Sequence, residues 1–124
     1  MRIIIADDSD LIRERLRNAL TGIRNIEIVG EAKNGLEAMR LLEDENPDCL
    51  ILDLGMPEMN GIAVLIKGKK QVPGCKFFIF TGYSEKVYKE KCLSEGADYF
   101  FDKNREFGVL IKTFNDIANT VKVA

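Results

Sequence analysis

Short apolar runs alternate with helical patterns five times along this 124-residue chain. Each run is too short for a helix and is rich in β-branched or aromatic residues, which is typical of strands. The runs occupy residues 3–5, 26–29, 49–52, 77–80 and 99–101. Because single helices between strands indicate βαβ units, the pattern predicts an α/β fold: a (βα)5 open, doubly wound parallel sheet with right-handed crossovers.

The same pattern makes predictions about individual elements. The run at 26–29 has a Glu between Ile residues, so we expect that strand at an edge of the sheet. The helix around residues 62–66 is expected to weaken at Gly68, because glycine disfavours helix interiors. The next helix is expected to begin after Ser84 as its N-cap and to stop at Gly96.

Composition excludes several functional classes. A net charge of −2 gives no global basic footprint for nucleic acid or anionic membranes. No apolar run approaches the roughly 18 residues of a membrane span, and the apolar start is too short for a signal peptide. Cys49, Cys75 and Cys92 form no CxxC pair, so we interpret them as reduced core thiols of a cytoplasmic protein. The absence of His excludes a phosphohistidine carrier and His-based catalysis in this chain.

Polar side chains follow four of the predicted strands at the point where each ends. Asp7 and Asp8 follow the first strand, and Asp53 follows the third. Thr81 ends the fourth strand and Lys103 follows the fifth. Open α/β sheets bind their ligands at these carboxyl ends. Three carboxylates there repel one another by about 4 kcal/mol per pair at ~4 Å and an effective dielectric of ~20, so we expect a cation. Oxygen ligands alone favour Mg²⁺, or Mn²⁺, with several retained waters.

These groups together suit a phosphoryl group. A metal ion, the ammonium of Lys103 and the hydroxyl of Thr81 around the carboxylate of Asp53 would form an electrostatic clamp. Each residue alone has a simpler explanation, such as an acid at a helix N-terminus, a β-branched strand residue or a solvated lysine. Their joint placement, one after each appropriate strand, favours a functional site.

With these motifs in this order, the chain resembles the receiver domain of two-component response regulators along essentially its whole length. The motifs are residues 3–9 (IIIADDS), 52–61 (LDLGMPEMNG), 80–82 (FTG) and 96–103 (GADYFFDK). The resemblance implies a flavodoxin-like fold with strand order 2-1-3-4-5. It also implies one receiver domain over residues 1–124 with no output domain, and a phosphorelay protein of the cytoplasm. Met1 directly before the first strand suits a natural start.

The resemblance also implies a role for each site residue. Asp53 would be the phosphoacceptor, taking a phosphoryl group from a histidine kinase or a histidine phosphotransfer protein. Asp8 would bind Mg²⁺ directly, Asp7 would support it largely through water, and the carbonyl of Gly55 would complete the protein ligands beside Asp53. Lys103 would pair with Asp53 and then with a phosphoryl oxygen.

Signal output in such domains depends on a switch. By resemblance, Thr81 would swing its hydroxyl to the phosphoryl group and vacate space that Phe100 can fill. Two packings of one aromatic ring make an element that a phosphoryl charge can bias. The implied output surface, for a downstream protein, is the fourth helix, fifth strand and fifth helix. Dimerisation stays open, and we expect no turnover of a separate substrate.

The sequence departs from the family pattern in several places, among them the loop after Lys103 and the positions of Gly55 and Tyr83. Asn104 follows Lys103 where many receivers have Pro, often after a cis peptide, so this loop is either strained or differently routed. Gly55 and Tyr83 occupy positions that flank the phosphoryl group in the family. Because Gly55 has no side chain to position water and Tyr83 is bulky, we expect slow autodephosphorylation.

Three alternative functions share parts of the pattern. An adaptor with this fold and an inactive site would bind partners without phosphorylation. A haloacid-dehalogenase-like phosphatase also has an Asp nucleophile after its first strand, and Asp8-Ser9-Asp10 mimics its DxD motif, but the chain lacks room for a cap. A flavodoxin-like FMN binder needs a phosphate-binding loop where Asp7 and Asp8 would repel the phosphate.

Overall fold

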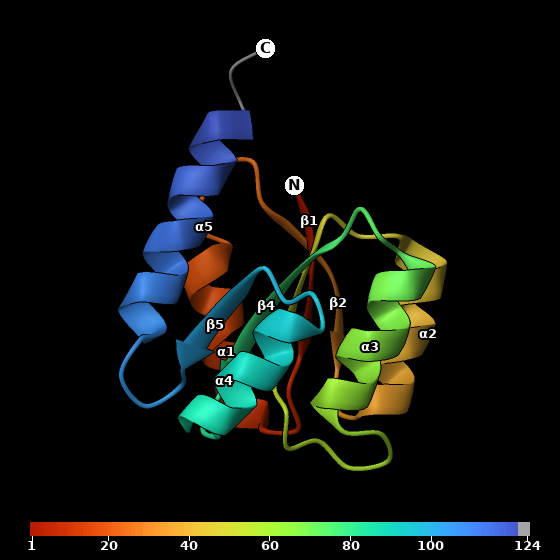
Figure 1. Ribbon diagram of the computed structural model, residues 1–124. Coiled ribbons are helices and arrows are strands. Elements are labelled where there is room, and N and C mark those ends of the chain that lie inside the picture. The colour runs from red at the N-terminus through yellow and green to blue at the C-terminus, as the bar shows by residue number, and fades with distance from the viewer. Residues whose placement is uncertain (122–124) are drawn as a thin grey trace.

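Strands and helices alternate strictly in the computed structural model, which describes residues 1–121 (Figure 1). The strands are β1 (Arg2–Ala6), β2 (Glu27–Ala32), β3 (Cys49–Leu52), β4 (Lys76–Thr81) and β5 (Tyr99–Asp102). The helices are α1 (Asp10–Leu20), α2 (Gly35–Glu45), α3 (Gly61–Gln71), α4 (Lys86–Ser94) and α5 (Phe107–Val121). All neighbouring strands pair in parallel in the order β2-β1-β3-β4-β5, which confirms the predicted fold class and strand order.

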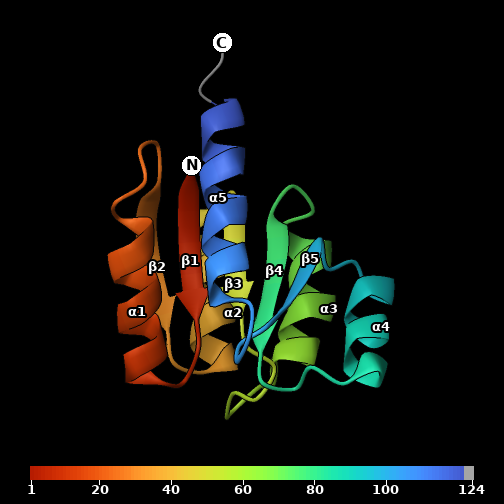
Figure 2. The same ribbon diagram turned by 90° about the vertical axis from the view of Figure 1, so that its left-hand side faces the viewer.

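Helices cover both faces of the sheet. Figure 2 shows α1 and α5 on one face and α2 and α3 on the other. Successive side chains of β1 serve the two layers in turn: Ile4 belongs to the core under α2 and α3, and Ile3 and Ile5 belong to the core under α1 and α5. This explains why β1 and β3 are apolar without alternation. No helix within residues 1–121 is long and apolar enough to span a bilayer.

Strand β2 and helix α3 extend further than expected. β2 is an edge strand as expected, but it extends to Ala32, because Gly30–Ala32 continue the parallel pairing with β1. This pairing is made by the backbone and needs no apolar side chain. We expected α3 to weaken at Gly68, but the helix continues through Gly68 to Gln71. A Cβ atom at Gly68 would lie 2.7 Å from Cζ of Phe77, so the glycine allows the helix to pack closely on the sheet.

Helix α4 is the least firmly anchored helix. It begins at Lys86 after Glu85, which makes no capping hydrogen bond through its side chain, so the prediction of Ser84 as N-cap was wrong. Among the residues of α4 only Cys92 is buried. The helix ends as predicted, with Gly96 in the left-handed region at φ 103°.

The three cysteines are free and buried, as expected. Burial raises the pKa of the Cys49 and Cys75 thiols to about 12 and that of Cys92 to about 11. The thiols therefore remain protonated at neutral pH and act as small apolar side chains in the core.

Candidate functional site

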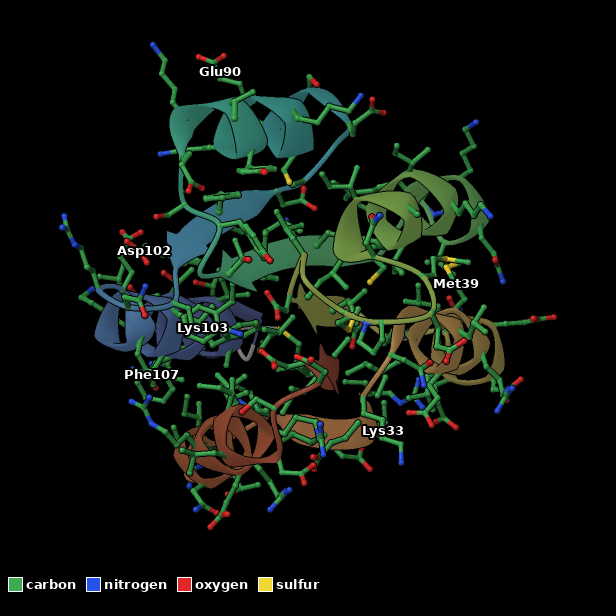
Figure 3. The ribbon with its side chains drawn as sticks, turned by 90° about the horizontal axis from the view of Figure 1, so that it is seen from below. Lys33, Met39, Glu90, Asp102, Lys103 and Phe107 are labelled. Carbon is green, nitrogen blue, oxygen red and sulfur yellow. The ribbon has the colours of Figure 1, made fainter. Side chains whose placement is uncertain are left out.

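The carboxyl ends of the parallel strands bring the predicted acids together at one edge of the sheet. One carboxylate oxygen from each of Asp7, Asp8 and Asp53 lies within 4.8 Å of the other two. Figure 3 views the molecule from this edge and labels Lys103, which follows β5. Asp7 and Asp53 are buried, whereas Asp8 is exposed. The acids predicted from the strand ends therefore form one cluster with an open side.

Asp7 is held by contacts on several sides. Its Oδ1 accepts a hydrogen bond of 2.9 Å from the amide of Ser9, and its Oδ2 accepts one of 2.6 Å from Nζ of Lys103. Its own amide donates to the carbonyl of Ala32 at the end of β2. Burial raises the pKa of the Asp7 carboxyl above its usual value, although the hydrogen bonds from Lys103 and Ser9 oppose the rise. The ionised form of the buried Asp7 carboxyl is thus stabilised by nearby positive charge.

Lys103 supplies that charge to two acids at once. Its Nζ lies 2.6 Å from Oδ2 of Asp7 and 3.2 Å from Oδ2 of Asp53. Burial lowers the pKa of the Lys103 ammonium, but the hydrogen bonds and charges of the two aspartates outweigh it, so the net pKa is raised. Sequence reasoning gave Lys103 only Asp53 as a partner and missed its shorter contact with Asp7.

The donor set fits a hard divalent cation. Three carboxylates cluster here and one ammonium pairs with two of them, which leaves an excess of negative charge. The atoms that these side chains offer to a metal ion are all oxygens. This is the chemistry that Mg²⁺ and Mn²⁺ prefer. Gly55 follows Asp53 by two residues and is exposed at the same edge. A Cβ atom at Gly55 would lie 2.8 Å from Cε2 of Tyr83, so the Tyr83 ring lies across this glycine.

Thr81 and Phe100 lie on neighbouring strands. Thr81 is fully buried, and its Oγ1 accepts a hydrogen bond of 3.2 Å from the amide of Tyr83. Phe100 pairs with Ile79, two residues before Thr81, so the three side chains share one face of the sheet. The partly buried Phe100 ring lines a cavity of about 710 Å³, which also contacts Lys89 of α4. Phe100 therefore borders open space on its outer side.

The loop after Lys103 takes a different route from a cis-proline turn. No peptide bond within residues 1–121 is cis. The amide of Lys103 donates to the carbonyl of Thr81, and the amide of Asn104 donates to Oδ1 of Asp102 at 2.9 Å. Oε1 of Glu106 accepts a hydrogen bond from the amide of Asp102. Asp102 thus closes an Asx turn that directs Lys103 inward without a proline. Of the two alternatives expected for this loop, a strained cis peptide or a different route, the structure has the different route.

Comparisons with known proteins agree with the fold and the motifs. Residues 3–115 match the family model of the response regulator receiver domain. The transcriptional regulatory protein YhcZ of Bacillus subtilis is 40% identical over 113 residues, covering 91% of this chain and 53% of that protein. The nitrate/nitrite response regulator NarL of Escherichia coli is 30% identical over 116 residues, covering 94% and 54%. This chain thus spans about half the length of both relatives.

A solved structure extends the comparison to three dimensions. A DNA-binding response regulator of the LuxR family from Staphylococcus aureus superposes with a TM-score of 0.86 at 33% identity. The match covers 95% of this chain and 98% of that one.

Proposed function

This chain belongs to the response regulator receiver domains of two-component systems, and from that premise we propose that Asp53 accepts a phosphoryl group from a partner's phosphohistidine. The observation that carries the proposal is the cluster itself: a buried Asp53 within 4.8 Å of two further carboxylates and 3.2 Å from the Lys103 ammonium. A structural salt bridge between Lys103 and two aspartates would not need a third carboxylate, Asp8, beside them. A site that receives an anionic phosphoryl group together with a divalent cation would.

In the proposed reaction, a carboxylate oxygen of Asp53 attacks the phosphorus in line with the bond to the donor imidazole. The P–O bond forms as the P–N bond breaks, and the imidazole leaves with the electron pair and takes up a proton. A bound Mg²⁺ would supply positive charge to the phosphoryl oxygens. Asp8 and Asp7 would hold the ion with Asp53 and the Gly55 carbonyl. Lys103 would turn from the carboxylates to a phosphoryl oxygen.

The proposed signal leaves through a surface change. Thr81 would donate its hydroxyl to the phosphoryl group, and Phe100 would move into the space that Thr81 leaves. The cavity beside Phe100 supports this step, because a ring that borders open space is not locked in place by packing all around it. We propose a histidine kinase or histidine phosphotransfer protein as donor and a downstream protein at the α4-β5-α5 face. In this proposal residues 1–124 form one cytoplasmic receiver domain without a separate substrate to turn over.

The proposal is tested by intact-mass spectrometry after incubation with Mg²⁺ and acetyl phosphate. We expect one added phosphoryl group on the wild-type chain, none on Asp53→Asn and one on the exposed-site control Asp116→Asn. Absence of the wild-type adduct would favour the phosphorylation-independent adaptor. Turnover of a phosphomonoester that survives Asp53→Asn and is lost in Asp8→Asn would instead indicate the phosphatase.

The Tyr83 ring is expected to prolong the life of the phosphorylated state. Because the ring lies across Gly55, two residues after Asp53, we expect it to restrict the approach of water to the phosphorylated Asp53. We expect Tyr83→Ala to shorten the phosphoprotein half-life about tenfold, equivalent to about 1.4 kcal/mol of activation free energy. The measurement is loss of the mass adduct with time in Mg²⁺.

The matched control for this prediction is Tyr88→Ala. Its ring stacks edge-on against Tyr83 at 5.6 Å, but it is not the ring that a Cβ atom at Gly55 would meet. A half-life of seconds in the wild type, or equal half-lives in wild type and Tyr83→Ala, would contradict the prediction.

A further inference from the structure

Arg13, on α1, reaches back to the loop that carries two of the three clustered acids. Its Nη1 donates a hydrogen bond of 2.6 Å to the backbone carbonyl of Asp7. The Arg13 side chain is only 13% exposed, which is unusual for an arginine at a helix surface. Its guanidinium therefore serves a contact inside the molecule.

The contacted carbonyl belongs to the peptide between Asp7 and Asp8. The Asp7 side chain is fixed by Ser9 and Lys103. Asp8 is exposed, and no hydrogen bond or ion pair within residues 1–121 holds its side chain. Within the described residues, Asp8 is thus constrained through its backbone, and Arg13 holds the peptide plane that precedes it.

Arg13 is itself held in place from two sides. It forms an ion pair with Asp10 at the start of α1, and its Nε lies 3.5 Å from Oε1 of Glu31 on β2. Arg17, one turn later, also binds Glu31, at 2.7 Å and 3.0 Å, but is 45% exposed. The two arginines thus share a carboxylate partner, whereas the hydrogen bond to the acid-bearing loop is made by Arg13.

We propose that Arg13 is a positioning residue that orients Asp8 through the Asp7–Asp8 peptide and thereby strengthens binding of a divalent cation. This inference rests on the proposed metal site. The direction in which cation affinity changes when Arg13 is replaced separates this positioning role from a simple electrostatic effect of the Arg13 charge. Removing a positive charge near a cation site should tighten cation binding by Coulomb attraction, whereas removing an orienting contact should weaken it. The direction of the change therefore identifies which effect dominates.

The test measures metal affinity of the unphosphorylated protein. Free Mn²⁺ is followed by electron paramagnetic resonance during titration, and Mg²⁺ is added as a competitor. We expect Arg13→Met to weaken binding about tenfold, the lower end of the range for residues that orient metal ligands. Arg13→Lys keeps the charge and one donor and should lie between wild type and Arg13→Met. Arg17→Met, the matched control, should bind like the wild type, and Asp8→Asn should lose binding.

Two further readouts separate positioning from general destabilisation. Urea unfolding shows whether each variant is folded during the titration. Nitrogen-15 spectra of the metal-free protein should show the Asp8 amide shifted in Arg13→Met and unshifted in Arg17→Met. If Arg13→Met does not fold, Arg13→Lys carries the test, with a several-fold loss of affinity expected.

The outcomes distinguish this inference from the proposed function. Unchanged or tighter binding in the folded Arg13 variants would overturn the inference and leave the metal site intact. Absence of Mn²⁺ and Mg²⁺ binding in the wild type would overturn the metal site, and the inference with it.

Discussion

Replacement of Lys103 with Met is expected to lower the free energy of unfolding by about 3 kcal/mol at pH 7 without divalent cations. Lys103 contacts Asp7 at 2.6 Å and Asp53 at 3.2 Å. These two residues are only 2% and 6% exposed, so the substitution leaves two buried carboxylates without their shared cation. Removing one partner of a buried ion pair is costly because the remaining charge stays desolvated. Urea unfolding in EDTA measures the effect.

Added Mg²⁺ and added protons should each reduce the loss of stability in Lys103→Met. Saturating Mg²⁺ supplies the missing charge, so the stability gap between wild type and Lys103→Met should narrow, and by linkage the variant should bind Mg²⁺ more tightly.

Lowering the pH should also narrow this stability gap, because protonation removes the charge of the buried Asp7 carboxylate. Because its folded-state pKa is raised, its protonation stabilises the fold fully below the usual value of 3.8, and this contribution is lost as the pH rises through the folded-state pKa. The gap should therefore narrow as the pH falls from 7 toward 4.

Lys112→Met is the matched control for this substitution. Lys112 pairs with Asp116 at 3.0 Å, but the two side chains are 76% and 61% exposed. A surface pair of this kind contributes about 0.5 kcal/mol or less, so the change should be small and insensitive to Mg²⁺. If Lys103→Met in EDTA were no more destabilising than Lys112→Met, Lys103 would not be offsetting buried charge.

The sequence was sufficient to predict the fold and the meeting of the acids. Apolar runs without alternation mark strands covered on both faces, and parallel pairing places their carboxyl ends at one edge. Asp7, Asp8 and Asp53 were therefore predictable neighbours. The contact between Lys103 and Asp7 was not, because it depends on the turn that Asp102 closes with Asn104. A pattern of residue types does not report the path of such a loop.

Other features depended on contacts that a pattern of residue types does not report. Helix propensity predicted weakening at Gly68, but the close approach of Phe77 makes glycine the residue that fits there. Serine is a favoured N-cap residue, yet the N-cap of α4 is Glu85 and not Ser84. Arg13 carried no signal in the sequence, since a basic residue on an exposed helix usually contacts solvent. Its hydrogen bond to the carbonyl of Asp7, in the β1–α1 loop, became visible only in three dimensions.

Gly61, the last residue of the motif around Asp53, is expected to be intolerant of even one methyl group. A Cβ atom there would lie 2.2 Å from the carbonyl oxygen of Asp53 and 2.6 Å from Cα of Leu54. Both are backbone atoms, so no side-chain rotation relieves the overlap. We expect Gly61→Ala to lower the free energy of unfolding by about 3 kcal/mol, although alanine is normally favoured over glycine in helices by about 1 kcal/mol. Urea unfolding measures this change.

Gly108→Ala provides the control with the opposite sign. Gly108 also lies near the start of a helix, α5, but a Cβ atom there would meet no atom within 4 Å. We expect this variant to gain about 0.5–1 kcal/mol, because alanine restricts the unfolded chain. Because Gly61→Ala must displace the backbone of Asp53 itself, the variant that remains folded should also lose the phosphoryl adduct, whereas Gly108→Ala should keep it. Equal stability of the two variants, or a wild-type adduct on Gly61→Ala, would show that the loop yields to the methyl group without moving Asp53.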